Sequence, residues 1–351
     1  MKLGRRLLMR CVPAAALVTM LFATQMLWAQ ETKEKVTVDD VERSFMLRLP
    51  RGYDPQHSYP VVILLHGMNQ DADDMERLTR FDELADKNGI ITVYPFAWHG
   101  RWNVGVRAQE RLPMGMGPGR HRRYGGYPGG GGSPGSGGQQ PSSSEPSEDR
   151  RPAPADDIGF FNQLLDQLKS KVSLDESRIY AAGLSEGGFM SLRIGCALSD
   201  RIAAVAAVGA SMPKTMVCLP SRPVPLLMIN GTSDPIVPYG GGTEHNLNLA
   251  TISAEDSAKA WAKIDRCGEK PEKDKIPPKE KGGTETKVDT YAGCQQNAQV
   301  VLYSVKGGGN TWPGGEQYEV EKTIGKTSQD LNANETIWGF LAAQKLPPQA
   351  K

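Results

Sequence analysis

Short, continuously apolar segments alternate with helical patterns along this chain, and this alternation restricts the possible folds more than any other feature. Residues 61–65, Val-Val-Ile-Leu-Leu, include no polar side chain. This is expected for a strand that is covered on both faces of a mostly parallel sheet. Similar segments recur at residues 90–94, 178–182, 202–208, 224–229 and 300–305. With helical patterns between them, they predict a single α/β domain.

Local sequence signals locate an N-terminal hairpin and three helices within this pattern. Residues 32–38 and 43–49 alternate apolar and polar side chains around Asp39-Asp40, which predicts an antiparallel hairpin at the N-terminal edge of the sheet. Asp156-Asp157 and Ser253 are caps for two of the predicted helices. The apolar stripes of three helices contain Ile158, Phe161, Leu165 and Leu168, then Ala258, Trp261 and Ile264, then Leu331, Trp338 and Leu341. Such stripes are typical of core packing, and they predict helices on both faces of the sheet.

Residues 1–29 have the organisation of a secretory signal. A basic start is followed by an apolar run at residues 11–23, and Ala29 is a small residue at the predicted cleavage point before Gln30. Arg5-Arg6 also resembles a twin-arginine export signal. The alternative is an uncleaved anchor, but the run contains Pro13 and is shorter than the ~20 residues that a membrane span needs. We therefore predict a secreted or periplasmic domain of residues 30–351, without a membrane span after cleavage.

Charge and cysteine content are consistent with export. The 41 Lys and Arg residues are balanced by 40 Asp and Glu residues, so no nucleic-acid partner is indicated. The mature chain keeps four cysteines, an even number suited to an oxidising compartment. Of the three possible pairings we favour Cys196–Cys218 and Cys267–Cys294, because each closes a short loop beside a predicted helix. No CxxC or spaced histidine pair predicts a metal site, and no motif implies a cofactor.

Residues 107–152 interrupt the α/β pattern. Their centre consists almost entirely of Gly, Pro and Ser, so ordering it costs more conformational entropy than packing returns. We predict a disordered surface insertion within the domain. Its arginines (Arg120, Arg122, Arg123, Arg150 and Arg151) are compatible with binding to an anionic polymer, although a solvated linker is the favoured interpretation. A second polar segment, Glu269–Lys287, is predicted to be an exposed loop.

The most informative motif is Gly183-Leu-Ser185-Glu-Gly187, which follows a predicted buried strand and opens a predicted helix. This context is the one that a nucleophile elbow requires, with Ser185 projecting from the carboxyl edge of the sheet. Gly67 and Met68 follow the strand at residues 61–65, and their backbone, with that of Glu186, is predicted to form an oxyanion hole. His66 is predicted to be structural. Asp234 follows another buried strand and is the candidate acid of a triad.

Several such strings occur together in one known group. The sequence resembles the secreted polyhydroxybutyrate depolymerase-type esterases, which include feruloyl and acetylxylan esterases. The strings that carry the resemblance are Leu64-Leu-His-Gly67 with Gln70, Tyr94-Pro95, Trp102-Asn103, Asp156-Asp157-Ile-Gly-Phe160, Gly183-Leu-Ser-Glu-Gly-Gly188, Ser199-Asp-Arg-Ile-Ala-Ala-Val205, Gly231-Thr-Ser-Asp234 and Gly307-Gly-Gly-Asn-Thr-Trp-Pro-Gly-Gly315. The resemblance implies an α/β-hydrolase fold and a Ser, Asp, His triad in that chain order. It also implies ester substrates and a substrate rim that includes Trp102, Asn103 and Trp312.

The chain departs from this family at the position of the triad histidine, which is Asn310. An amide cannot accept the serine proton near neutral pH, so Ser185 lacks its expected base. In a comparable serine hydrolase, removal of the histidine lowers turnover by a factor on the order of 10⁶. His245 and His99 are the two candidate substitute bases, because His57 and His121 belong to polar segments. Glu186 also occupies a position where asparagine is common in the family.

Three functional hypotheses follow. The first is a secreted serine ester hydrolase that acts on a polyester or an acylated polysaccharide. The second is a catalytically inert protein that uses the hydrolase cleft to bind polyester or plant-wall ester polymers. The third is a matrix-associated structural protein that acts through the Gly- and Arg-rich insertion. The sequence leaves the ester and the oligomeric state open.

Overall fold

The computed structural model describes residues 30–105, 155–244, 248–279 and 283–348. The predicted signal at residues 1–29 and the whole of the predicted insertion at residues 107–152 lie outside these ranges. All described residues belong to one unit of the chain.

Six parallel strands form the centre of a ten-stranded sheet in the order β1-β2-β4-β3-β5-β6-β7-β12-β11-β10. The parallel strands are β3 (Tyr59–Leu65), β4 (Ile91–Pro95), β5 (Leu174–Leu184), β6 (Ala204–Val208), β7 (Leu226–Gly231) and β12 (Val300–Val305). Along β3, Val61, Ile63 and Leu65 join the core on one face. Val62 and Leu64 join the core on the other. Strands covered on both faces therefore follow from the continuously apolar segments, as predicted.

Antiparallel strands form both edges of this sheet. At one edge, β1 (Gln30–Val38) and β2 (Val41–Leu49) pair around Asp39 and Asp40, whose φ angles are 47° and 62°. Positive φ at both turn residues matches the right-handed twist of the strands, and the predicted hairpin is confirmed. At the other edge, β10 (Glu272–Ile276) pairs with β11 (Thr286–Tyr291), which pairs with β12.

The edge strand β10 corrects the prediction of a loop over Glu269–Lys287. Most of its described residues are exposed, as expected, but residues 272–276 form a strand, and Thr284 and Thr286, just before and at the start of β11, are buried. Their sequence, Glu-Lys-Asp-Lys-Ile, lacks the apolar run of a central strand because neither face is covered. Charged side chains of this kind also protect a sheet edge from pairing with other chains.

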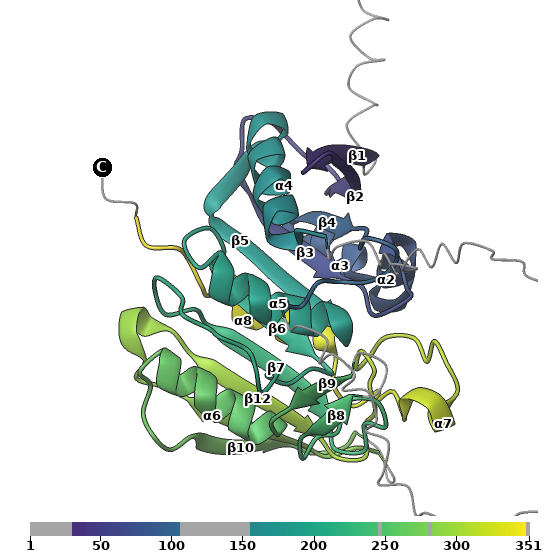
Figure 1. Cartoon of the computed structure of the whole chain (residues 1–351), viewed down its shortest axis with the longest axis vertical. Helices are drawn as coiled ribbons and strands as arrows, with labels where there is room; N and C mark the ends of the chain where they lie inside the picture. Colours follow the sequence, from purple (N-terminus) through teal and green to yellow (C-terminus); the bar gives the residue numbers. More distant parts are fainter. Residues whose placement is uncertain (1–29, 106–154, 245–247, 280–282, 349–351) are drawn as a thin grey trace, which may run out of the picture. The chain divides into compact units, whose positions relative to one another are not determined.

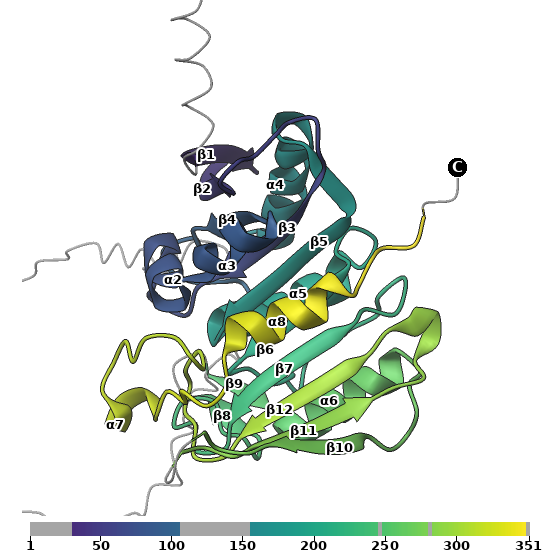
Figure 2. The same ribbon diagram turned by 180° about the vertical axis from the view of Figure 1, so that it is seen from behind.

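Helices cover both faces of the sheet, as Figures 1 and 2 show from opposite sides. Helices α4 (Asp157–Lys171), α5 (Glu186–Ala197) and α6 (Ala254–Ile264) pack on one face. Helices α2 (Ala72–Thr79), α3 (Phe81–Asn88) and α8 (Ala333–Ala342) pack on the other. The shorter elements are β8 (Gly242–Glu244), β9 (Leu249–Thr251), η2 (Gln295–Asn297) and α7 (Glu321–Ile324).

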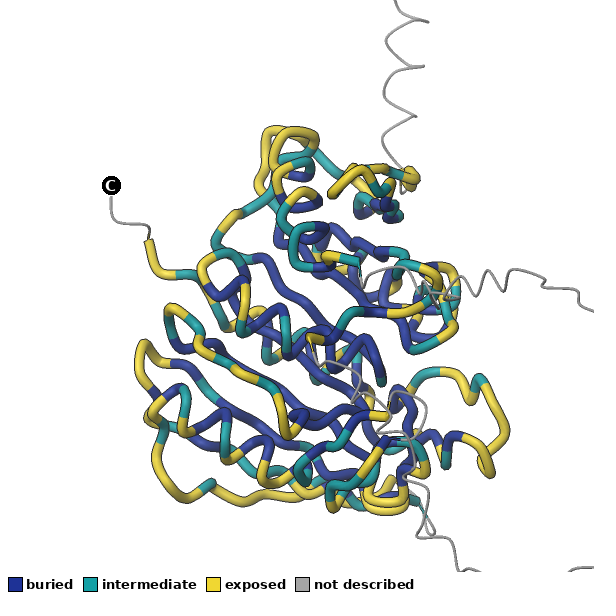
Figure 3. The backbone as a smooth tube through the Cα atoms, viewed as in Figure 1, coloured by how far each residue is buried: buried dark blue, intermediate teal, exposed yellow. Residues whose placement is uncertain are grey.

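The predicted helix caps and stripes are confirmed, except that Leu331 is buried just before α8 and does not belong to it. The side chain of Asp156 accepts a hydrogen bond from the Gly159 N–H at the start of α4, and that of Ser253 accepts one from the Asp256 N–H at the start of α6. Phe161 and Trp261 are buried, and Figure 3 shows the central strands as buried along most of their length. Within the described residues, no helix is both long and apolar enough to span a membrane.

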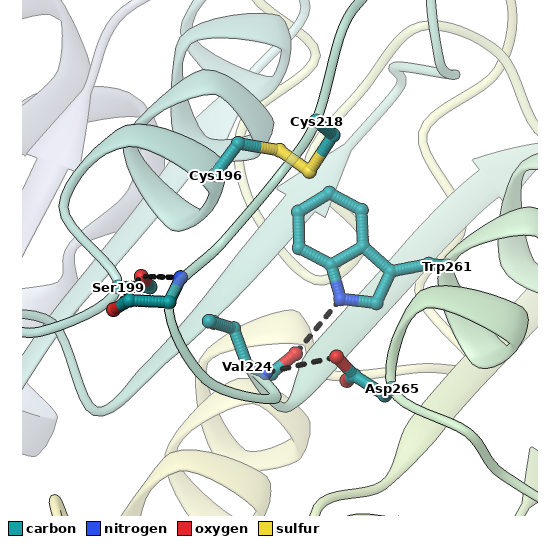
Figure 4. Close-up of a disulfide and its surroundings, with 7 residues drawn as sticks. Cys196, Ser199, Cys218, Val224, Trp261 and Asp265 are labelled. Carbon is teal, nitrogen blue, oxygen red and sulfur yellow. Dashed lines mark hydrogen bonds between the residues drawn. A yellow bond between two sulfur atoms is a disulfide. The ribbon is translucent and has the colours of Figure 1, made fainter.

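Both favoured disulfides, Cys196–Cys218 and Cys267–Cys294, are present. Figure 4 shows the first beside the indole of Trp261, whose Nε1 donates to the carbonyl oxygen of Val224 at 2.8 Å. The Val224 N–H donates to Asp265 Oδ1 at 3.0 Å. The disulfide thus links α5 covalently to the segment before β7, and the hydrogen bonds of Val224 hold the same segment to α6 and its C-terminal end.

The sheet order, the helices on both faces and the strand-to-helix turn between β5 and α5 together make this an α/β-hydrolase fold. The predicted fold class is confirmed.

Candidate active site

Ser185 lies in a sharp turn between β5 and α5. Its φ and ψ angles are 56° and −117°, a strained backbone conformation for a residue with a side chain. Glycines make the turn possible: a Cβ on Gly183 would lie 2.2 Å from the carbonyl oxygen of Gly187, and one on Gly187 would lie 2.2 Å from that of Leu65. Such strain concentrates at functional sites, and here it places Ser185 at the carboxyl edge of the sheet.

The loop after β3 lies against this turn. A Cβ on Gly67 would be 3.6 Å from the Cβ of Ser185. The Gly67 N–H donates to Gln70 Oε1 at 2.9 Å, so this N–H already has an acceptor. Among the described hydrogen bonds none uses the N–H of Met68, and the Glu186 N–H is at the first turn of α5, where helices leave donors without intrahelical partners. Met68 and Glu186 are therefore the better candidates for the oxyanion hole.

His66 supports this loop and is structural, as predicted. Its side chain is fully buried, its Nδ1 lies 2.7 Å from the Gly67 carbonyl oxygen, and its Nε2 accepts from the Ala97 N–H at 3.1 Å. These partners assign the proton to Nδ1 of a neutral ring. Burial also lowers the pKa of His66. Both ring nitrogens are engaged, so this imidazole is not a base for Ser185.

Asp234 and Asn310 contact each other, as the triad pattern requires of these two positions. Asn310 Nδ2 donates to Asp234 Oδ2 at 2.7 Å. The other carboxylate oxygen, Asp234 Oδ1, accepts from the N–H groups of Ile236 and Val237, both at 2.8 Å. Burial raises the pKa of Asp234 to about 6, although these hydrogen bonds favour the charged form. The carboxylate thus holds the side chain at position 310 as it would hold an imidazole.

The orientation of the Asn310 amide follows from its partners. Nδ2 donates to Asp234 Oδ2 and also to the carbonyl oxygen of Gly209 at 3.0 Å, which uses both of its hydrogens. A flipped amide would set an oxygen against two acceptors, so Oδ1 must face the other way. Oδ1 is buried and has no hydrogen-bond partner among the described residues. Gly209, at φ 59°, accommodates this side chain because a Cβ there would lie 2.8 Å from Nδ2.

The side chain of Glu186 connects the nucleophile turn to the loop after β4. Its Oε1 accepts from Arg101 Nε at 3.0 Å, whereas its Oε2 is buried without a partner among the described residues. Burial raises the pKa of Glu186 to about 7, although Arg101 acts in the opposite direction.

These residues meet at a cavity of about 510 Å³. Its walls include Gly67, Met68, Ser185, Glu186 and Asn310, so the predicted nucleophile, oxyanion loop and residue at the histidine position come together. Asn310 contributes to the wall although its side chain is closed to bulk solvent. Asp234 lies behind Asn310 and is not part of the wall.

The three predicted rim residues do not line this cavity, which corrects that prediction. Trp102 is 4% exposed and its Nε1 donates to the His66 carbonyl oxygen at 2.9 Å. Trp312 is fully buried and donates to Asn334 Oδ1 at 2.8 Å. Asn103 donates through Nδ2 to the Ala155 carbonyl oxygen at 2.9 Å. The aromatic rings of this motif stabilise the loops from within the core, where they have no access to a substrate.

Of the two candidate substitute histidines, only His99 belongs to the described residues, and it does not reach the site. His99 is exposed, packs edge-on against Trp98 with ring centroids 4.5 Å apart, and is absent from the cavity wall. His245 lies outside the described residues. Its neighbour Glu244, however, is buried and lines the cavity.

Sequence reasoning missed several cavity residues, namely Asp74, Arg77, Glu244, Tyr318 and Glu319. Tyr318 donates its hydroxyl to the Asn310 carbonyl oxygen at 3.0 Å. The signal available for Glu244 was its position beside His245 on the segment that follows Asp234. The described residues contain no group of three His, Cys, Asp or Glu side chains arranged to hold a metal ion.

Comparison with known proteins agrees with this geometry. Residues 38–110 match the profile of the Esterase family, described as "Putative esterase". Over 324 residues the chain is 27% identical to "Putative esterase NocK" of Nocardia uniformis subsp. tsuyamanensis, a match that covers 89% of this chain and 83% of that protein. The chain is related to the esterases. The predicted relationship, and with it the general class of carboxylic-ester hydrolases, is confirmed.

Two further matches are a protein named as a feruloyl esterase and one named as an acetyl xylan esterase. Over 163 residues this chain is 35% identical to "Feruloyl esterase B" of Piromyces equi. The match covers 44% of this chain and 29% of the Piromyces protein. The chain thus spans less than a third of the Piromyces protein. Among solved structures, the acetyl xylan esterase from Aspergillus awamori matches with a TM-score of 0.49 and 13% identity, covering 80% of this chain and 94% of that one.

Proposed function

We propose that this protein is a secreted serine carboxylic-ester hydrolase in which Ser185 is the nucleophile. The observation that carries the proposal is the strained turn at Ser185, which opens on a cavity beside the loop at Gly67 and Met68. The esterase relationship supports it. Ester hydrolysis uses this arrangement because a serine on a tight turn can approach a carbonyl carbon without its own strand or helix in the way.

In the proposed reaction, the Ser185 hydroxyl attacks the ester carbonyl carbon and the alcohol leaves, forming an acyl-enzyme that water then hydrolyses. Negative charge develops on the carbonyl oxygen. The N–H groups of Met68 and Glu186 donate to it, and each such donor lowers the barrier by roughly 3 kcal/mol in related enzymes. The N-terminal end of α5 adds a favourable dipole.

Asn310 limits the rate of this reaction. Its Oδ1 can accept a hydrogen bond and orient a hydroxyl, but an amide oxygen does not take a proton near neutral pH. The protein should therefore be a slow hydrolase unless another group supplies the base. His245 remains a candidate for this role because its neighbour Glu244 lines the cavity. His99 is a weaker candidate because it is exposed and outside the cavity wall.

For the substrate, we propose esters of an acylated polysaccharide, such as the feruloyl esters for which the Piromyces relative is named, rather than a polyester. Most of the described residues that line the cavity have polar or charged side chains, and a polyester chain offers them no hydrogen-bond donors. The two disulfides support export. Export itself is tested by the N-terminal sequence of the protein recovered from its host.

A rate comparison tests the nucleophile. Purified protein should hydrolyse a short-chain aryl ester, and Ser185→Ala should reduce the rate to background. A fluorophosphonate should add one adduct mass to the wild type and none to the variant. Equal rates in both proteins, with no adduct on Ser185, would overturn the proposal.

Asn310 favours a second candidate function, an inert hydrolase-like protein that binds ester polymers in the same cavity. It predicts negligible turnover together with saturable binding to acylated xylan or to polyhydroxybutyrate granules. Turnover that depends on Ser185 would exclude it.

A further inference from the structure

The proposed reaction requires a group that takes the proton of the Ser185 hydroxyl. The described part of the cavity wall contains no histidine and no lysine. Glu186 is the carboxylate next to Ser185 in the chain, but its Oε1 accepts from Arg101 Nε at 3.0 Å. Arg101 follows β4, whereas the Asn310 side chain contacts the segment that follows β6, and these two strands lie on opposite sides of β5. The ion pair therefore holds the Glu186 carboxylate toward the β4 side of Ser185.

On the β6 side, Ser185 and Asn310 are attached to neighbouring carbonyl groups. The Ser185 N–H donates to the Val208 carbonyl oxygen at 2.8 Å. Asn310 Nδ2 donates to the carbonyl oxygen of the next residue, Gly209, at 3.0 Å. Consecutive residues of a chain are only about 3.8 Å apart between Cα atoms, and both Ser185 and Asn310 line the cavity. A single small ligand can therefore contact both side chains.

Asn310 Oδ1 is the acceptor that such a ligand would meet. The side chain is fully buried, and Oδ1 has no hydrogen-bond partner among the described residues. Asp234 and Gly209 hold Nδ2, so Oδ1 is fixed on the other side of the amide. A buried acceptor without a donor is unfavourable, and a ligand that supplies an N–H is stabilised there. The Asp234 carboxylate polarises the amide and strengthens this hydrogen bond.

We propose that the cavity binds a small neutral imidazole-type ring between Asn310 and Ser185 and uses it as the general base. One ring nitrogen donates its N–H to Asn310 Oδ1, and the other accepts the proton of the Ser185 hydroxyl. The proposal rests on the proposed ester hydrolysis and names a second ligand of the same site. Neutral imidazole has a donor and an acceptor on opposite sides of one small ring, and it titrates near neutral pH, which suits a general base. A cavity of about 510 Å³ has room for the ring beside an ester.

The ring returns to its neutral form in each half of the reaction. As Ser185 Oγ bonds to the ester carbonyl carbon, its proton moves to the ring nitrogen and forms an imidazolium. The imidazolium gives this proton to the alcohol oxygen as the C–O bond breaks. Water then attacks the acyl-enzyme, and its proton passes through the ring to Ser185 Oγ. The Asp234 carboxylate stabilises the imidazolium through the Asn310 amide that it contacts.

Hydrolysis of ethyl butyrate with and without imidazole tests the proposal. An alkyl ester is used because imidazole by itself attacks aryl esters, and the rate with Ser185→Ala is subtracted. At about pH 8, where imidazole is mostly neutral, imidazole should raise the rate saturably by at least about tenfold. 1-Methylimidazole is a base of similar strength without a ring N–H, and it should raise the rate by less than about twofold. No effect of imidazole, or an equal effect of the two rings, would overturn the proposal.

Variants assign the effect to position 310. Asn310→His supplies its own ring, so added imidazole should change its rate by less than about twofold. Asn310→Leu is similar in size but lacks the acceptor, and the ratio of the two ring effects should fall to about one. Asn88→Leu, at an exposed position of α3, should keep the wild-type ratio. A ratio within one protein cancels any loss of folded protein.

Two results with these variants would contradict the proposal. The first is a preference for imidazole over 1-methylimidazole that survives Asn310→Leu. The second is a wild-type rate that does not respond to imidazole and is abolished in His245→Ala, because His245 would then be the base.

Binding separates this inference from the proposed function. If the wild type hydrolyses no ester at any imidazole concentration, the proposed function fails, but an NMR titration still measures how the ring binds. The wild type should bind imidazole at least about fivefold more tightly than 1-methylimidazole, and Asn310→Leu should lose this preference. Equal binding of the two rings, or no binding of imidazole, would contradict the proposal whatever the turnover.

Discussion

At the scale of single residues, the buried acids dominate the expected response to pH. Asp265 is fully buried, and desolvation raises its pKa from 3.8 to about 7, although the Val224 N–H and Arg222 act in the opposite direction. A carboxyl whose pKa is higher in the folded state stabilises the fold at low pH. It loses this contribution as the pH rises through the folded pKa. The stability of this protein should therefore fall between pH 5 and pH 8.

Asp265→Asn tests this expectation. The amide does not ionise. When the pH is raised from 5 to 8, the free energy of unfolding of the variant should therefore increase by on the order of 2 kcal/mol relative to that of the wild type. Urea unfolding of both proteins at the two pH values measures the difference. Asp234 and Glu186 contribute the same pH dependence to the free energy of unfolding of both proteins, so their contributions cancel in the difference. The same change of stability with pH in the two proteins would contradict the account.

The sequence was sufficient to predict those candidate site residues that belong to a local sequence motif. Ser185, Asp234 and Asn310 were predicted from their strings, and the last two lie in contact. Glu244 and Tyr318 were not predicted, because the glycines that precede them carry no periodic pattern and the position of both residues depends on long-range packing. The assignment of Trp102 and Trp312 to a substrate rim was wrong, because a motif does not show whether an aromatic ring faces the cavity or the core. An aromatic residue in a motif near a site can stabilise the loops from inside.

At the scale of elements, the close approach of α5 to β3 determines how Ser185 is presented. In Gly187→Ala, the new Cβ would lie 2.2 Å and 2.6 Å from the carbonyl oxygens of Leu65 and His66, and backbone atoms cannot move aside as a side chain can. We expect a loss of about 2 kcal/mol in stability and a large loss of esterase rate.

A glycine with open surroundings provides the control. Gly339 is exposed within α8, and a Cβ there would meet nothing within 4 Å. Gly339→Ala should raise stability by about 0.5–1 kcal/mol and leave the esterase rate unchanged. Thermal unfolding and aryl-ester rates measure both effects. If Gly187→Ala behaved like Gly339→Ala, the close packing of the elbow would be disproved.

The elements themselves were largely predictable. Continuous apolar runs gave the central strands, and caps such as Ser253 gave helix starts. The strand β10 was not predicted, because an exposed edge strand keeps no apolar pattern. The β8–β9 hairpin was missed because three-residue strands are too short for periodicity to be detected.

At the scale of the whole molecule, the insertion leaves and rejoins the domain at one place. Asn103 donates through Nδ2 to the Ala155 carbonyl oxygen at 2.9 Å and through its backbone N–H to Asp157 Oδ2 at 2.6 Å. The two ends are therefore already adjacent, and a short linker can join them.

Replacement of residues 107–154 by a short Gly-Ser linker should consequently leave the α/β domain intact. We expect a melting temperature within about 3 °C of wild type and an aryl-ester rate within about twofold. Calorimetry and a rate assay test this. A large loss of stability or activity would show that the insertion is part of the working domain, as the structural-protein hypothesis requires.

The most direct test of the account is the aryl-ester rate of Asn310→His beside wild type and Asn310→Gln. Asp234 is already in place to orient a ring at position 310, and the cavity opens on its free side. The histidine variant should be faster than wild type by at least about tenfold, and Asn310→Gln should show no gain. A folded Asn310→His protein with no gain in rate would contradict the assignment of Ser185, Asp234 and position 310 to one catalytic site.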